Sequence, residues 1–259
     1  DTVAASYRGP APGRLSGSTL VSMLAASYKL TSEFAPFVRV GVLHADLPGG
    51  DSAVVMSNVA MGGHYVRKVC QDVRLTLTLG AVLPVGSAAG NSPNAVEGRA
   101  MRAGPPARSA MDNALFGSND LSLFPGVGLA YVAHGFTVQA EATVIQAWRV
   151  QGEKVQPDAA KSNFTTGLFA GYFLVPQLSV GVELDYQRFL STPAAVRQDP
   201  TRASRDTLTA GGGLRAHIKL GDWAWVRPGI SYARGLDQPT GGAGANYSVI
   251  QLDVPLILL

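Results

Sequence analysis

Apolar and polar residues alternate with a period of two along much of the chain. Residues 207–220 show the pattern most fully: Leu208 and Leu214 belong to the apolar series, and Thr209 and Arg215 to the polar series between them. Successive side chains of a pleated strand point to opposite faces, so the pattern predicts a strand with one apolar and one polar face. The stretch is long enough for the roughly 9–11 residues that a tilted strand needs to cross a bilayer.

The same alternation recurs along the chain, and we count twelve strands. The short connections lie near Ser32, Gln71, Gly135, Pro176 and Asp222. The long connections are centred near residues 12, 49, 91–114, 157, 197 and 242. Short turns at one end and long loops at the other are typical of a transmembrane barrel with an even number of strands, so residues 2–8 have to form the first strand. The prediction is an all-β, antiparallel up-and-down barrel that takes up residues 1–259 as a single domain.

Composition agrees with a barrel in lipid. Hydrophobic residues make up 46% of the chain and charged residues only 15%, against about 25% charged residues in soluble domains. The sequence has no apolar run long enough for a transmembrane helix. A net charge of +3 is too small and too scattered to indicate nucleic-acid binding. The single cysteine, Cys70, excludes an internal disulfide, and we expect it to be an idle thiol at a periplasmic turn.

Charged side chains on the polar faces are the main candidates for function. By the alternation, the inward-facing charges are Arg39, Arg74, Glu141, Arg149, Glu183, Asp185, Arg215, Lys219, Arg227 and Asp253. As a filter in a polar lumen, six basic residues against four acidic ones favour anionic or zwitterionic solutes. The alternative is that these charges pair across the modest interior and close the barrel, because buried charges need partners.

Residues 86–120 form the longest predicted loop and contain Arg99, Arg102 and Arg108. One hypothesis is that this loop folds inward as a constriction, because loops of this length are usually functional or mobile. Its many small and polar residues favour the other hypothesis, a mobile extracellular loop.

No motif in the sequence indicates catalysis or metal binding. His217 lies on the inward face and is expected to be a hydrogen-bonding residue of the lumen, and the other histidines lack the spacing of a metal site. A hydrolase needs a serine beside a histidine base and a group that orients it, and the sequence has no His-x-Ser segment. The glycines 211–213 lie within a strand, where they permit close packing or a bend. We therefore expect no catalytic residue, metal or cofactor.

Three stretches carry a resemblance to a known class of proteins. Residues 28–34 (YKLTSEF), 75–86 (LTLTLGAVLPVG) and 249–256 (VIQLDVPL) resemble segments of bacterial outer-membrane β-barrels, most of all the porin-like and transporter-like barrels of Gram-negative bacteria. The resemblance implies an outer-membrane location, with the lipid bilayer and lipopolysaccharide as partners, and passage of small hydrophilic solutes. The chain departs from the class at its end, because Leu258–Leu259 replaces the usual terminal aromatic residue.

Three functions follow, in order of support from the sequence. The first is a passive channel for small hydrophilic solutes, which needs neither enzyme activity nor a cofactor. The second is a closed structural barrel that anchors or docks a partner protein through its extracellular loops. The third is a membrane-embedded hydrolase, which a serine-directed probe would label.

Overall fold

The computed structural model describes residues 1–8, 16–47, 49–91, 94–154, 156, 158–198, 204–236 and 246–258. The centres of three predicted long connections, at residues 12, 157 and 242, lie outside these ranges.

Strands run along almost the whole described chain. They are β1 (Thr2–Arg8), β2 (Ser16–Ser27), β3 (Phe34–Asp46), β4 (Ser52–Met56), β5 (Val59–Lys68), β6 (Val73–Leu83), β7 (Asp120–Ala133), β8 (Phe136–Arg149), β9 (Ala160–Val175), β10 (Leu178–Phe189), β11 (Asp206–Ala216), β12 (Ile218–Leu220), β13 (Ala224–Val226), β14 (Gly229–Gly235), β15 (Asn246–Asp253) and β16 (Leu256–Leu258). Four pairs, β4–β5, β11–β12, β13–β14 and β15–β16, are single strands with a short break. The wall therefore has twelve strands, as predicted.

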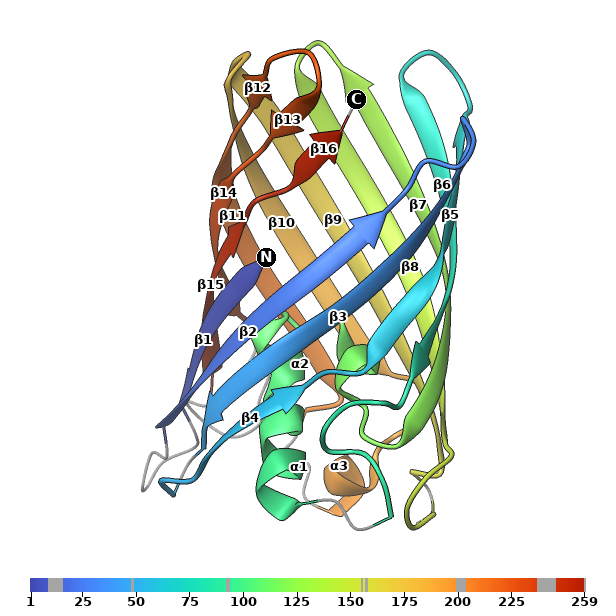
Figure 1. Ribbon diagram of the computed structural model, residues 1–259, viewed down its shortest axis with the longest axis vertical. Coiled ribbons are helices and arrows are strands. Elements are labelled where there is room, and N and C mark those ends of the chain that lie inside the picture. Colours follow the sequence, from blue (N-terminus) through green and yellow to red (C-terminus); the bar gives the residue numbers. More distant parts are fainter. Residues whose placement is uncertain are drawn as a thin grey trace.

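The strands close into an antiparallel barrel (Figure 1). The predicted first strand exists as β1 and completes the wall by pairing with β2 on one side and β15 on the other. Val3, for example, lies opposite Val21 of β2 and Gln251 of β15. The five predicted short turns lie at one end of the barrel, here called the turn end, and the opposite end is called the loop end.

The outer face of the wall is apolar. Leu24 is 70% exposed, Leu79 is 64% exposed and Val182 is 58% exposed, and each belongs to the apolar series of its strand. Burying such residues in a hydrocarbon phase is favourable at about 25 cal/mol per Å². The surface that would meet water in a soluble protein is thus suited to lipid. Among the described residues, no helix is long and apolar enough to cross a membrane.

The stretch 207–220 is not the uninterrupted strand that its alternation predicts. It breaks at His217, whose backbone amide donates to the carbonyl of Gln177. The neighbouring strands break next to Pro228 and Pro255, because proline has no N–H to donate to the ladder. Beyond the three breaks, β12, β13 and β16 pair with one another as a small three-stranded sheet at the turn end.

The helices gather toward the loop end (Figure 1). They are α1 (Ala95–Arg102), α2 (Gly104–Ala107), the 3-10 helix η1 (Asn113–Phe116) and α3 (Ala194–Gln198). The first three belong to residues 86–120, here called the inserted segment. In Figure 1, α2 lies inside the barrel, behind β1 and β2.

Candidate functional site

The inserted segment fills part of the lumen at the loop end. Its side chains Met101, Leu115 and Phe116 are buried and belong to one apolar cluster with Val21 and Leu43 of the barrel wall. This burial supports the hypothesis that the segment folds inward, whereas composition favoured a mobile extracellular loop. A few apolar side chains spread among small residues are enough to fold the segment, because inward-facing apolar residues of the wall cover them.

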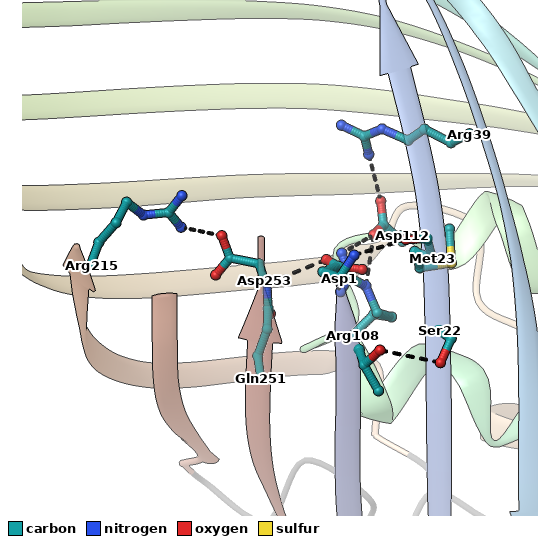
Figure 2. Close-up of polar contacts among 10 residues, drawn as sticks. Asp1, Ser22, Met23, Arg39, Arg108, Asp112, Arg215, Gln251 and Asp253 are labelled. Atoms are coloured by element: carbon teal, nitrogen blue, oxygen red, sulfur yellow. Dashed lines mark hydrogen bonds and ion pairs between the residues drawn. The ribbon is translucent and has the colours of Figure 1, made fainter. Parts of the chain in front are cut away.

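An ionic network ties the segment to three strands of the wall (Figure 2). The guanidinium of Arg108 lies 2.8 Å from the carboxylate of Asp1 and 2.9 Å from that of Asp112. Arg39 of β3 reaches Asp112 at 3.2 Å, and the Gln251 amide of β15 donates to Asp1 at 3.3 Å. Both side chains of the Arg108–Asp112 pair are less than a fifth exposed, so solvent weakens their attraction little.

The protonation of Asp112 follows from this network. Burial by itself raises the pKa of Asp112, but the charges of Arg108 and Arg39 and the hydrogen bond from Arg108 outweigh it and hold the pKa below its ordinary value. Asp112 is thus a carboxylate that accepts from two cations.

Asn58 holds both stems of the inserted segment. Its side-chain amide donates to the Gly117 carbonyl at 2.8 Å, its side-chain oxygen accepts from the Gly86 amide at 3.0 Å, and its backbone amide donates to Leu115. These bonds replace ladder bonds at the break between β4 and β5. The sequence did not predict this break, which is the point where the wall forms hydrogen bonds with both ends of the segment.

A cavity of about 500 Å³ lies in the lumen toward the turn end. Its charged lining residues are Glu183, Arg215, Arg227 and Asp253. Arg215 pairs with Asp253 at 2.6 Å, and Gly229 leaves room for this pair, because a Cβ there would come within 2.8 Å of Asp253.

A second cavity, of about 160 Å³, adjoins the first and is lined by Glu141, Glu183 and Asp185. Glu141 and Asp185 lie on β8 and β10, on either side of Gly167 of β9. A Cβ at Gly167 would lie 3.2 Å from Asp185 and 3.5 Å from Glu141. Among the described residues, no cation forms an ion pair with any of the three carboxylates.

The remaining predicted lumen charges lie away from the cavities. Arg149 pairs with Asp120 at 3.3 Å near the loop end. Lys219 pairs with Asp222 at 2.7 Å in a short turn, and Arg74 is exposed near the turn end of β6. The ten predicted charges therefore do not form one cluster. They lie in three kinds of place: at the contact between the wall and the inserted segment, along the two cavities, and near the turn end and the loop end of the barrel.

The sequence places Arg108 in the long loop but gives neither Arg108 nor Asp112 a role, because alternation does not show whether residues 86–120 fold inward. A signal was present in strands 16–27 and 52–68, where both faces hold apolar residues. A wall strand that is apolar on its inner face needs something to cover it.

His217 forms the hydrogen bond that its inward position predicted. Its Nε2 lies 2.9 Å from the Ser179 hydroxyl, and its ring packs on Phe173 with centroids 4.6 Å apart. Within the described residues, no side chain forms a hydrogen bond with Nδ1, the other ring nitrogen of His217. The contact is a serine beside a histidine without a group that orients the histidine.

Comparisons with known proteins identify the fold. No family model and no curated protein matches the chain. Among solved structures, the NanC porin superposes with a TM-score of 0.58 at 10% identity and covers 98% of both chains. An outer-membrane channel from Pseudomonas putida F1 gives a TM-score of 0.58 at 11% identity, covering 98% of this chain and 95% of its own. The chain thus has the fold of outer-membrane β-barrel channels.

Proposed function

We propose that this protein is a channel in a bacterial outer membrane through which small hydrophilic solutes diffuse passively. The observation that carries the proposal is the charged cavity of about 500 Å³ inside a closed barrel whose outer face is apolar. The bilayer, with lipopolysaccharide in its outer leaflet, surrounds the wall. The loop end faces the outside of the cell.

The charge balance of the lumen bears on the solutes. The sequence count of six basic to four acidic residues favours anionic or zwitterionic solutes. In the structure, Arg39, Arg149, Arg215 and Lys219 each pair with a carboxylate. The carboxylates Glu141, Glu183 and Asp185 have no such partner among the described residues. The proposal is therefore passage of small hydrophilic solutes without a general preference for anions.

Current recording in planar bilayers tests the channel. We expect discrete opening steps from purified, folded protein, with a small unitary conductance because the inserted segment narrows the loop end. A folded barrel that gives no opening steps rules the channel out.

A closed barrel that docks a partner protein is the second candidate. The observation in its favour is the burial of Met101, Leu115 and Phe116 against the wall, which removes space from the lumen. A partner that co-purifies in fixed ratio with a barrel of zero conductance would establish it.

A hydrolase rests on the contact between Ser179 and His217 alone. The channel accounts for this contact as part of a polar lining, and a serine needs more than a neighbouring histidine to become a nucleophile. Labelling of Ser179 by a fluorophosphonate, abolished in Ser179→Ala, would support the hydrolase.

A further inference from the structure

Two charged side chains of opposite sign in the larger cavity form no ion pair with any described residue. Glu183 and Arg227 both line it, and neither forms an ion pair within the described residues. The other cation there, Arg215, is already neutralised by Asp253 at 2.6 Å. The Nε of Arg227 is buried without a hydrogen-bond acceptor. A confined charge without a partner is costly, and a solute that carries both signs would relieve both residues.

The positions of these residues set the length of that solute. Glu183 is aligned with Gly211, and Arg215 with Gly229, so Arg227 lies further toward the turn end than either. At about 3.3 Å per residue, Glu183 and Arg227 are rooted roughly 20 Å apart along the wall. Part of that distance is taken up by the two side chains and by an ion-pair contact of about 3 Å at each end. Roughly 10 Å then remains for the solute itself, the length of about three extended residues.

The carboxylate end of the cavity has an aromatic surface. Phe169 is aligned with Glu183 across β9 and β10 and lines both cavities. Its ring lies over Gly171 and Gly181, where a Cβ would come within 2.9 Å and 2.6 Å of ring atoms. A carboxylate next to an aromatic ring attracts an ammonium group through both charge and ring quadrupole.

We infer that the larger cavity binds a zwitterionic solute of about tripeptide length on its way through the channel. The ammonium group lies between Glu183 and Phe169, and the carboxylate lies against Arg227. The carboxyl groups of Glu141 and Asp185 line the adjoining cavity, next to the ammonium end. This inference rests on the proposed channel and names the class of solute.

Four forms of one peptide test the inference in liposomes that contain the full-length protein. The forms are trialanine, its N-acetyl derivative, its amide, and the derivative blocked at both ends. We expect trialanine to permeate roughly fivefold faster than each singly blocked form, the effect expected of one partly exposed ion pair. The form blocked at both ends should be slower still, because it lacks both contacts. Arabinose, which is uncharged, reports whether the channel is open.

Single substitutions test which residue binds each end of the solute. Glu183→Gln should equalise trialanine and its N-acetyl form, and Arg227→Gln should equalise trialanine and its amide, whereas Arg227→Lys should keep the wild-type order. Lys219→Gln is the matched control, because Lys219 lies in β12 next to a turn and does not line the cavity. Unchanged arabinose permeation shows that each variant is folded.

Equal permeation of the four peptides through a channel that passes arabinose overturns the inference and leaves the channel standing. Faster passage of either singly charged form also overturns it. Failure of the wild-type protein to pass arabinose removes the channel itself, and the inference with it.

Discussion

The two sides of the barrel interior use the same strand pattern for opposite purposes. On β1–β6, inward positions include Val3, Val21, Leu43 and Val82, all essentially inaccessible to solvent, and the inserted segment covers them. On β8–β11, inward positions include Glu183 and other polar side chains that line cavities. The outer faces of both sides are apolar. The comparison teaches that the inner residues of a strand decide whether the lumen beside it is filled or open.

The largest effect on conductance is expected from removing the inserted segment, which covers the apolar inner face of β1–β6. Replacing residues 94–116 with a short Gly-Ser linker should raise the unitary conductance several-fold, because the loop end loses its filling. Single-channel recording measures this change, and circular dichroism checks that the strands remain. An unchanged conductance would show that the segment does not lie on the path of the ions.

The ionic network should matter less than the whole segment. Arg108→Ala leaves Asp1 and Asp112 without their shared cation, which should cost about 2–3 kcal/mol once residual exposure is allowed for. We expect more frequent transitions to a state of higher conductance. Lys219→Ala, which removes an exposed ion pair in a turn, is the control and should leave the recording unchanged. The network would be irrelevant to gating if the two variants behaved alike.

Acid should act on the same network in a definite direction. The pKa of Asp112 in the folded protein lies below its ordinary value of 3.8, so its ion pairs stabilise the segment fully above that pH and lose their effect as the pH falls through the lower value. Open transitions should therefore become frequent only below about pH 4. Asp112→Asn should show them at neutral pH and lose the acid-dependent step. A wild-type step above pH 5 would contradict the assignment to Asp112.

The smallest effect is expected on the polar side. Gly167→Ala places a Cβ 3.2 Å from Asp185 and should push that carboxylate slightly into the lumen, with a modest loss of conductance. Gly128→Ala is a matched control, because a Cβ there meets its first neighbour at 3.7 Å. Equal conductance in both variants would show that the smaller cavity does not limit the current.

Much of the wall could be predicted because the strand period depends only on neighbours in the sequence. The twelve strands, the short turns and the first strand at residues 2–8 follow from it. The breaks at His217, Pro228 and Pro255 could not be placed in the same way, because they depend on pairing between strands that are distant in the sequence. Pro228 and Pro255 stand in the sequence, but which ladder bond each of them removes depends on the strand that lies beside it.

The candidate site was predicted only in part. Alternation placed Glu183, Arg215 and Arg227 on inward faces, and they line one cavity. It could not show that Arg215 pairs with Asp253 while Arg227 forms no ion pair with any described residue, because ion pairing depends on distances across the lumen. Charge counts along a sequence therefore overstate the free charge of a narrow barrel.

Helix α2 contacts strands from both ends of the chain, and this contact has a consequence for how the barrel closes. α2 packs against β1, β2 and β15, and Arg108 bonds to Asp1, which also accepts from Gln251. A piece from the middle of the polypeptide thus lies across the junction of the first and last strands. Docking of the inserted segment and pairing of the first and last strands stabilise each other. We therefore expect the lumen to be filled in the same cooperative step in which the barrel closes.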